Sequence, residues 1–440
     1  MSFDAKAMRS ANMTHTQMLM WMGQMLSGRR PVYNMGFSIH IDSDLDHDLF
    51  RQSYDYVVSK SDDLRSVFRH VDGGPQRVVL DFDEFDYDVP VVDFSDDPEA
   101  APAWMQEQLQ QYIDIRKMLF RSALVRVGPK KFIWFICQHH LLCDGWSIGN
   151  FMRMVGTRYE QLENKAPEEI DIPRFGDFVD REVAYYESDA CAESGKYWEE
   201  LTADPLPPLS LYDVSSDSGS NKFLREHRHL TGDLIGRMKA SIKNKDFRAF
   251  SIDQGLFLLM VTALVLQLRR ASGNDRFAIG VCLHHRVTPR DKETIGPFFV
   301  FSAMRIGLSA DDTFRSLYAQ VAAEYRVMLR HYRHPVITPP GERTWDTSIN
   351  FVNTSFPKFA GRDTAITWMQ SGSYLAQEAM GLQIHHFNEG DGMTAEWDFN
   401  LGIFDSEERR KRAMVDFEEA MEFGLGDPDA TLREFWENSA

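Results

Sequence analysis

Residues 132–147 read FIWFICQHHLLCDGWS, and this stretch decides how the whole chain is interpreted. Residues 132–138 are mostly apolar at odd and even positions alike, which predicts an interior strand with both faces covered. A short turn follows, and a helix is expected to begin near Ser147. Because a strand, a tight turn and a helix hold the side chains between them rigidly, we expect a functional group to be presented here.

Two adjacent histidines, His139 and His140, end the predicted strand. Neighbouring residues on a strand point to opposite faces, so only one of them can face a given cleft and the other must pack or orient. A neutral imidazole can accept a proton from an amine or hydroxyl, or position it. Asp144 can hold the shape of the turn, and Gly145 permits a close backbone approach. These four residues are the candidate catalytic residues.

Other interpretations of the histidines remain open on these grounds. The chain also contains the pairs His284–His285 and His385–His386, although neither lies between an apolar strand and a predicted helix start. Two adjacent strand residues cannot easily chelate one ion, and no HExxH or paired-cysteine pattern accompanies them, so no metal site is expected. No P-loop, GxGxxG or GxSxG pattern supports a nucleotide-binding or serine-hydrolase function.

Charge and composition exclude several classes of partner. The net charge of −18 repels nucleic-acid phosphates and anionic lipid, so neither nucleic acid nor a membrane surface is expected as a partner. The basic run at residues 409–412 is interpreted as a solvated helix face. The apolar run at 256–266 falls short of the ~20 residues that span a bilayer, and Ser251 precedes it at capping distance, so it predicts a buried core helix.

The four cysteines indicate free thiols in a reducing compartment. No apolar signal segment is visible at the N-terminus, so a cytoplasmic location is expected. Along the chain, the patterns predict helices at 14–27, 44–60 (capped by Asp44), 147–162, 175–198 and from about 406 (capped by Asp405). Strands are predicted at 34–41, 67–69, 76–80, 119–127, 132–138 and 278–283.

The stretch from His139 to Ser147 resembles the HHxxxDG motif of condensation domains of nonribosomal peptide synthetases, within the chloramphenicol-acetyltransferase-like superfamily. Other segments are similar to further motifs of that family in the same order, and together they cover nearly the whole chain. Leu19 and Ser61 replace an arginine and a histidine of those motifs. The similar segments are residues 16–21, 61–68, 113–126, 177–179, 197–198 and 295–305.

The resemblance implies an α/β fold of two acetyltransferase-like lobes, each a mixed sheet with flanking helices, in a V-shaped pseudodimer with an active-site tunnel at the interface. We expect the N-terminal lobe, with the HHxxxDG motif, at residues 1–180 and the C-terminal lobe at 181–440. The implied catalytic residue is the second histidine, His140. The tunnel is expected to be lined by Trp146, Ser147, Phe301 and Ser302.

Arg286 matches the arginine that pairs with the motif aspartate in that family. We therefore expect a structural ion pair between Asp144 and Arg286 across the lobe interface, formed through a planar, two-pronged contact. The alternative is that Asp144 only caps the helix that begins at Trp146 or Ser147.

The function implied is transfer of an acyl or peptidyl group from a carrier-protein phosphopantetheine thioester to an amine, forming an amide in nonribosomal peptide or related natural-product biosynthesis. No adenylation or carrier region is recognisable in the 440 residues. We therefore expect a free-standing monomer that uses a separate peptidyl or acyl carrier protein as donor and a free or carrier-bound amine as acceptor. No cofactor is expected on the enzyme itself. The alternatives are an ester-forming or CoA-dependent acyltransferase and a non-catalytic docking module.

Overall fold

The computed structural model describes residues 4–71, 73–217, 220–336, 344–354, 356–374, 378–388, 390 and 392–437. The chain divides into two compact units. Unit 1 comprises Met1–Ser188, His284–Phe299 and Thr354–Leu375, and unit 2 comprises Asp189–Leu283, Val300–Asn353 and Ala376–Ala440. Two segments of the second half of the sequence thus belong to unit 1. The domain boundary expected between residues 180 and 181 stays a prediction.

Helices and strands alternate along both units. The helices are α1 Ala5–Ala11, α2 His15–Ser27, α3 His47–Lys60, α4 Ala101–Gln110, α5 Gly145–Glu163, α6 Gly176–Tyr186, α7 Asp189–Thr202, α8 Gly232–Lys243, α9 Ile252–Ser272, α10 Pro289–Glu293, α11 Phe314–His331, α12 Glu407–Gly426 and α13 Leu432–Glu437, with short 3-10 helices at Phe82–Glu84 and Pro98–Ala100. The strands are β1 Asn34–Ile41, β2 Ser66–Val71, β3 Gly74–Val79, β4 Val91–Asp93, β5 Phe120–Gly128, β6 Lys131–His139, β7 Ser210–Leu211, β8 Val214–Ser215, β9 Phe223–Leu230, β10 Arg276–His284, β11 Phe299–Gly307, β12 Thr347–Val352, β13 Thr364–Gln370, β14 Met380–His385 and β15 Met393–Asn400.

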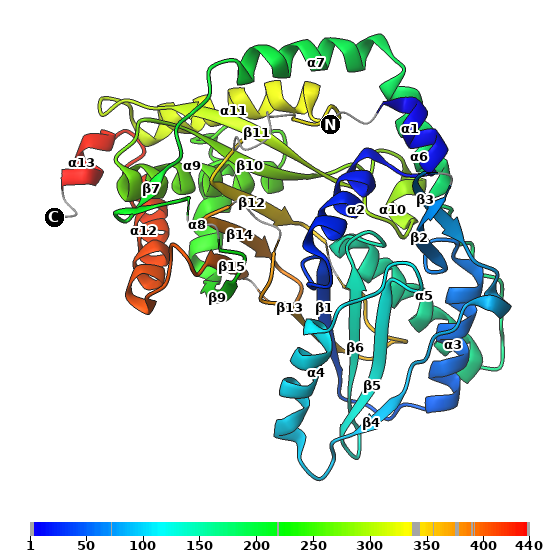
Figure 1. Cartoon of the computed structure of the whole chain (residues 1–440). Coiled ribbons are helices and arrows are strands. Elements are labelled where there is room, and N and C mark those ends of the chain that lie inside the picture. The colour runs from blue at the N-terminus through cyan, green and yellow to red at the C-terminus, as the bar shows by residue number, and fades with distance from the viewer. Residues whose placement is uncertain are drawn as a thin grey trace. The chain divides into compact units, whose positions relative to one another are not determined.

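Unit 1 is built on a five-stranded sheet in the order β13-β1-β6-β5-β4. Strands β13, β1, β6 and β5 run antiparallel, and β4 is parallel to β5. One face packs against α4, where Phe135 and Cys137 join the α4 side chains in one apolar cluster. The other face packs against α3 and α5, where Trp134 contacts Phe50 and Phe151. Figure 1 shows α4 and α3 on opposite sides of these strands, so β6 is the interior strand that its apolar pattern predicts.

Three details of the predicted helices were wrong. Helix α3 is capped by Asp46, whose Oδ1 accepts from the Asp48 and Leu49 backbone N–H groups, rather than by Asp44. Helix α12 is capped by Ser406 rather than by Asp405. In both places two or more good cap residues stand close together, and propensity alone does not choose between them. The helix predicted over 175–198 is two helices, α6 and α7, although no glycine or proline marks the break.

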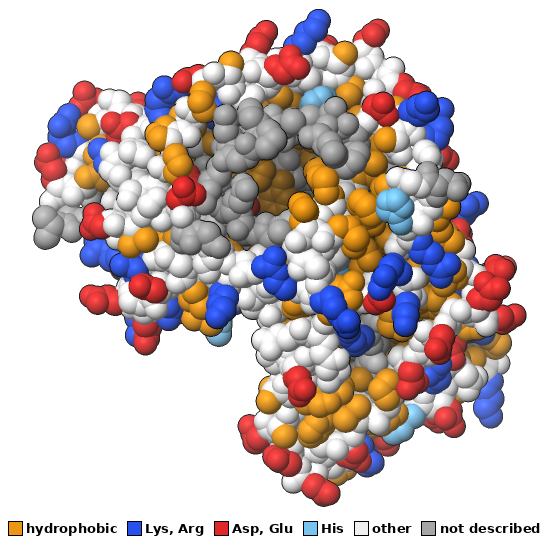
Figure 2. All heavy atoms as spheres, viewed as in Figure 1, with side chains coloured by type: hydrophobic (Ala, Val, Ile, Leu, Met, Phe, Trp, Pro, Cys, Tyr) orange, Lys and Arg blue, Asp and Glu red, His pale blue; other side chains and the backbone are white. Residues whose placement is uncertain are grey.

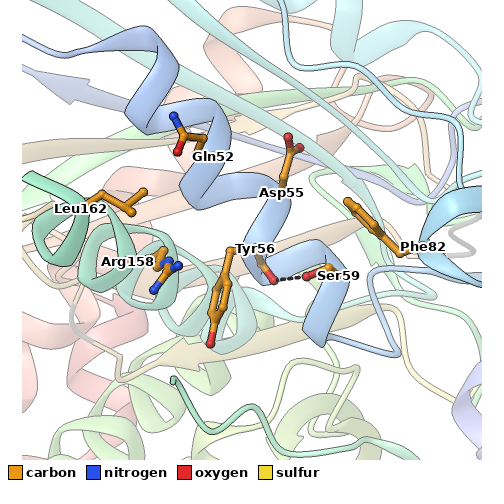
Figure 3. Close-up of a pocket in the computed structure, with 7 residues that line it drawn as sticks. All are labelled: Gln52, Asp55, Tyr56, Ser59, Phe82, Arg158 and Leu162. Atoms are coloured by element: carbon orange, nitrogen blue, oxygen red, sulfur yellow. Dashed lines mark hydrogen bonds between the residues drawn. The ribbon is translucent and has the colours of Figure 1, made fainter. Parts of the chain in front are cut away.

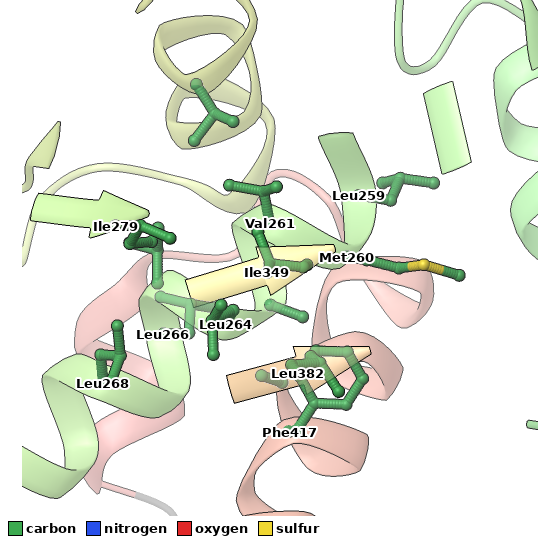
Figure 4. Packing of buried hydrophobic residues seen from close by; sticks show 14 of the residues in the cluster. Leu259, Met260, Val261, Leu264, Leu266, Leu268, Ile279, Ile349, Leu382 and Phe417 are labelled. Carbon is green, nitrogen blue, oxygen red and sulfur yellow. The ribbon is translucent and has the colours of Figure 1, made fainter. Parts of the chain in front are cut away.

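Unit 2 is built on a six-stranded sheet in the order β11-β10-β12-β14-β15-β9. β10, β12 and β14 pair in parallel, and β14, β15 and β9 pair antiparallel. The expected α/β fold, with a mixed sheet and flanking helices in each lobe, is thus confirmed in each unit. Helix α9 begins behind the predicted cap Ser251 and is buried almost along its whole length. Figure 4 shows its side chains packed with Ile349, Leu382 and Phe417 of the same core.

Helix α9 is the one helix of the described chain that is long and apolar enough to cross a membrane by length and composition. Most of its apolar window, 78%, is buried inside the protein, as the prediction of a core helix requires. The basic run in α12 is only in part the solvated helix face that was expected, because Arg410 is buried. All four of its cations are paired with carboxylates, Arg409 with Asp405, Arg410 with Glu226, Lys411 with Glu407 and Arg412 with Asp416. Figure 2 shows basic and acidic side chains interspersed over the visible face.

Candidate active site

His140 follows directly after β6, and its backbone continues the pairing of the strand. The His139 N–H donates to Leu119 O on one side, and the His140 N–H donates to Tyr33 O on the other. His140 Nδ1 lies 2.8 Å from the Cys143 carbonyl oxygen. Because a carbonyl only accepts, Nδ1 carries the hydrogen, and Nε2 of the neutral ring keeps its lone pair. The half-buried ring contacts the Phe299 ring, with 4.4 Å between centroids.

His139 points to the opposite face of the strand and has both ring nitrogens occupied. Its Nδ1 accepts from the Leu141 backbone N–H at 3.1 Å, so the hydrogen of the neutral ring lies on Nε2. Nε2 donates to Gln24 Oε1 at 3.1 Å. Gln24 Nε2 donates in turn to the carbonyl oxygens of Gly28 and Arg30. His139 is therefore fixed in one tautomer by a hydrogen-bonded chain that leaves no site for a substrate.

Burial lowers the pKa of both imidazoles. The pKa of His139 falls to about 3, chiefly because burial removes the water that would solvate its charged form, with a smaller effect of the neighbouring His140. The pKa of His140 is also lowered by burial, while the Cys143 carbonyl and the Asp144 charge act in the opposite direction. Both rings are therefore neutral at neutral pH. His140 is thereby able to accept a proton or a hydrogen bond from an N–H or O–H group.

Asp144 caps helix α5 and pairs with Arg286 at the same time. Its Oδ1 accepts from the Ser147 backbone N–H at 2.8 Å, which is the capping bond. Arg286 Nη2 lies 2.7 Å from Oδ1 and 3.0 Å from Oδ2. Oδ2 also accepts from the Phe298 backbone N–H at 3.0 Å. The two interpretations that the sequence left open, cap and ion pair, are both realised in one buried carboxylate.

The ion pair differs from the expectation in two respects. Both partners belong to unit 1, because the segment His284–Phe299 packs with the N-terminal part of the chain, so the pair does not join two lobes. The contact is also made by one nitrogen rather than two. Arg286 Nη1 is occupied by the carbonyl oxygens of Asp291 and Thr294, which leaves Nη2 for the carboxylate. The guanidinium lies over the Phe298 ring, 4.2 Å from its centroid.

Gly296 allows the close approach that closes this network. Its φ is +158°, and a Cβ at this position would lie 2.1 Å from the Phe175 ring. The Gly296 N–H donates to Ser147 Oγ at 3.0 Å, and its carbonyl oxygen lies 2.8 Å from the same hydroxyl. Arg286 Nη2 also reaches Ser147 Oγ at 2.8 Å. The start of α5 is therefore tied to the 284–299 segment by a group of buried polar contacts.

The other predicted residues of the motif have structural partners. Gly145 is the first residue of α5 and has no positive φ, so a left-handed conformation is not the reason for this glycine. Trp146 Nε1 donates to the Lys292 carbonyl oxygen at 2.8 Å, and its ring is half-buried. Ser147 is buried, and its hydroxyl is committed to the network around Asp144. A tunnel-lining role for Trp146 and Ser147 stays a prediction.

The remaining predicted tunnel residues lie in unit 2. Phe301 and Ser302 are consecutive on β11, so their side chains point to opposite faces of the strand and cannot form one wall. The Phe301 ring stacks on Trp345, with 6.1 Å between centroids. Ser302 is fully buried, and its hydroxyl has no hydrogen-bond partner among the described residues. Their contact with substrate also stays a prediction.

Gln138 lies two residues before His140, on the face of β6 that packs against α3 and α5. It is 1% exposed. Within the described chain, neither its amide oxygen nor its amide nitrogen has a hydrogen-bond partner. The residues opposite it are Met35 on β1 and Phe120 on β5, neither of which offers a strong hydrogen-bonding side chain. A buried amide without partners costs about 1–3 kcal/mol, so this side chain requires an explanation.

An open cavity of about 310 Å³ lies elsewhere on unit 1. Figure 3 shows its lining, which comes from α3, α5 and the 3-10 helix at Phe82, with Arg158 beside Tyr56. A second cavity of about 530 Å³ contains Tyr112 and Arg121. None of the candidate residues lines either cavity. No group of three or more His, Cys, Asp or Glu side chains suited to a metal ion occurs in the part of the chain that the structure describes.

The sequence interpretation missed two glutamines that support the site. Gln24 orients His139, and Gln17 Nε2 donates to the Leu141 carbonyl oxygen at 3.0 Å. Both lie on the buried side of α2, seven residues apart. Two polar side chains at this spacing, on the apolar face of a predicted helix, indicate that both glutamines form hydrogen bonds in the interior.

A family model described as "Condensation domain" matches residues 8–439. Among curated relatives, an isonitrile lipopeptide synthase of Streptomyces coeruleorubidus is 24% identical over 401 residues, covering 88% of this chain and 26% of its own. A dimodular nonribosomal peptide synthase of Bacillus subtilis is 22% identical over 405 residues, covering 89% of this chain and 17% of its own. The chain thus spans about a quarter or less of the length of these relatives.

Solved structures show the same fold. A variant of the starter condensation domain of rhizomide synthetase RzmA, in complex with C8-CoA, is 22% identical with a TM-score of 0.84, covering 96% of both chains. The first condensation domain of the CDA synthetase is 18% identical with a TM-score of 0.83, covering 96% of this chain and 97% of that one.

Proposed function

Because this chain belongs to the condensation domain family, we propose that it transfers an acyl or peptidyl group from a phosphopantetheine thioester on a carrier protein to an amine. The product is an amide in nonribosomal peptide or related natural-product biosynthesis. The curated relatives are peptide and lipopeptide synthases, which supports this assignment. The observation that carries it is the geometry of His140, a neutral imidazole. Its Nδ1 hydrogen is bound to Cys143 O, and its Nε2 has no hydrogen-bond partner among the described residues.

In the proposed reaction, the amine nitrogen attacks the thioester carbonyl while an N–H hydrogen bonds to His140 Nε2. The C–N bond forms, the C–S bond breaks, and the thiol leaves. The amine proton passes to Nε2 and from there to the departing sulfur, so the imidazole returns to its neutral form. His140 acts as proton acceptor in this proposal, and His139, Asp144 and Gly145 are positioning residues.

The Asp144–Arg286 pair holds the turn that carries His140. The Ser147 backbone N–H donates to Asp144 Oδ1, and Arg286 Nη2 contacts both carboxylate oxygens. These contacts restrict the motion of the turn from Leu141 to Cys143. This turn supplies the carbonyl that sets the His140 tautomer. We propose that the phosphopantetheine arm is supplied by the carrier protein and that the enzyme binds no cofactor of its own. We also propose a cytoplasmic monomer, supported by the reduced, buried thiols of Cys137 and Cys143.

The test is turnover of an octanoyl group loaded on a carrier protein, with a panel of free and carrier-bound amines, read by mass spectrometry of the amide. We expect product with the wild-type chain and almost none with His140→Ala. The matched control is His386→Ala, a partly exposed histidine from a pair outside this site. Equal product from His140→Ala and the wild type would overturn the proposal.

The same assay separates the alternatives. If soluble acyl-CoA serves as well as the loaded carrier, the chain is a CoA-dependent acyltransferase, and if alcohols exceed amines as acceptors, it is ester-forming. If no donor and acceptor pair gives product and a carrier protein co-purifies, the docking function replaces the catalytic one.

A further inference from the structure

The unexplained feature next to the site is the amide of Gln138. Gln138 lies on β6, and His140 follows directly after the strand, with one residue between the two. The backbone pairing continues through His140, whose N–H donates to Tyr33 O. Side chains two apart on a strand share a face, about 7 Å from each other along the strand. The amide is therefore a close neighbour of the catalytic imidazole on the same face.

No group of the described residues forms a hydrogen bond with this amide. Gln138 is 1% exposed, and both its amide atoms lack hydrogen bonds within the described residues. The side chains opposite it on the neighbouring strands belong to Met35 and Phe120. Leucine or methionine would fill such a place without the loss of hydration that an unpaired amide suffers. A bound group from outside the described residues would account for these polar atoms.

The chemistry of an amide limits what this partner is. An amide offers both donors and an acceptor, so it matches a group that does the same, such as a second amide or a hydroxyl. A carboxylate or ammonium group fits poorly, because one neutral amide in apolar surroundings does not replace the hydration of a full charge.

Resting on the proposed function, we propose that Gln138 determines substrate specificity by hydrogen-bonding a neutral amide or hydroxyl that the substrate carries close to its reacting carbon. The separation of about 7 Å from His140 places this group within a few bonds of the thioester carbonyl or of the attacking amine. The group comes either from the acyl donor, as a hydroxyl or a peptide amide, or from the acceptor, as an amide next to its amine.

The experiment measures kcat/KM for Gln138→Met, which keeps the length of the side chain and removes its amide. One arm varies the carrier-loaded donor among octanoyl, 3-hydroxyoctanoyl and N-acetylglycyl groups with propylamine as acceptor. The other arm keeps the octanoyl donor and compares propylamine with glycinamide. In the arm that varies the recognised substrate, we expect Gln138→Met to have a kcat/KM about tenfold or more below that of the wild type. This loss should appear with the substrate that bears the hydroxyl or amide. The octanoyl and propylamine pair should change less than twofold.

A control separates the role of this amide from a general effect of changing a buried glutamine. Gln267 is equally buried, in α9 of unit 2, and Gln267→Met should leave the ratios of kcat/KM between substrates unchanged. Without substrate, Gln138→Met should melt at the wild-type temperature or above it, because no internal hydrogen bond is lost. A melting temperature several degrees lower would show that the amide is satisfied inside the protein, and would overturn the proposal.

A uniform change of kcat/KM over both arms would also overturn it, because the amide would then bind only a buried water. If the wild-type chain forms no product with any pair, the proposed function fails, and binding tests Gln138 independently. The probes are N-acetylglycyl-pantetheine and octanoyl-pantetheine, read by the shift in melting temperature. An added stabilisation by the N-acetylglycyl probe that is lost in Gln138→Met supports the assignment, and equal shifts in both proteins contradict it.

Discussion

The two faces of strand β6 carry adjacent histidines in different surroundings. His139 uses Nδ1 and Nε2 within the protein, for Leu141 N–H and for Gln24, and burial holds its pKa at about 3. His140 uses Nδ1 for the Cys143 carbonyl, and its Nε2 has no hydrogen-bond partner among the described residues. The residue type is the same, and one residue of strand separates a fully bonded imidazole from one with a free lone pair. The hydrogen bonds around each ring, rather than the motif alone, support the proposed roles of the two histidines.

The largest effect expected from this comparison is on catalysis. His140→Ala should lower kcat by ~10²–10⁴-fold, because a placed proton acceptor contributes that much. The melting temperature should change little, since the half-buried ring makes one hydrogen bond to the protein. Turnover of carrier-bound octanoyl by the folded variant measures the effect. A loss below tenfold with an unchanged circular dichroism spectrum would contradict a central role for His140.

The next largest effect concerns the turn behind His140. Asp144→Ala and Arg286→Ala should each lower the free energy of unfolding by ~3–5 kcal/mol, because each leaves a buried charge without its partner. The double variant should be little worse than either single one. Denaturant unfolding of the four proteins of this cycle measures the coupling. Strictly additive losses would mean that capping, and not the ion pair, is what stabilises the turn.

On the opposite face, His139→Ala should affect stability more than chemistry. Gln24 Oε1 and the Leu141 N–H lose their partner, which should lower the free energy of unfolding by about 1–3 kcal/mol. kcat per folded molecule should stay within about threefold of the wild type. Should kcat fall as far as in His140→Ala while stability is unchanged, the assignment of the two histidines would have to be exchanged.

The pKa of His139 makes stability depend on pH. Its pKa is about 3 in the folded protein, against an ordinary value of about 6.5 in the unfolded chain, so the unfolded state binds the proton first as the pH falls. Between these two values the protein should lose up to ~1.4 kcal/mol of stability per pH unit through this residue. Denaturant midpoints measured from pH 7 to pH 5 should fall less steeply in His139→Ala. Identical slopes would show that His139 is protonated in the folded protein.

The smallest effect is a shift in the pH profile. Because burial lowers the pKa of His140, its neutral form persists below the ordinary value of 6.5. The acidic limb of kcat/KM for carrier-bound octanoyl should therefore have its midpoint below pH 6.5, with activity lost as the pH falls through it. A midpoint at or above pH 6.5 would indicate that the charged form of His140 is stabilised.

The strand-turn-helix around the site could be predicted because its signals are local. The apolar run of β6, the cap Asp144 and the start of α5 all lie within one short stretch. The family resemblance predicted Arg286 as the partner of Asp144. It did not predict that Arg286 lies in unit 1, because the packing of the 284–299 segment depends on contacts between residues distant in sequence. For the same reason, Gln24 could not be predicted as the partner of His139. The sequence also did not predict that the amide of Gln138, which is adjacent to the motif, is buried. Only three-dimensional contacts show that the Gln24 amide is hydrogen-bonded, whereas the Gln138 amide has no partner among the described residues.

Strand β13 pairs with β1 along its whole length, from Met35 opposite Gln370 to Ile41 opposite Thr364. During synthesis, the ribosome delivers these two strands more than three hundred residues apart. Until β13 emerges, β1 has one side of its backbone unpaired, and its mostly apolar sequence is open to association with other nascent chains. The five-stranded sheet of unit 1 therefore lacks its β13 edge until more than four fifths of the chain has been translated. A ribosome stalled before residue 364 would release a polypeptide with an exposed sheet edge, a substrate for chaperones and proteases.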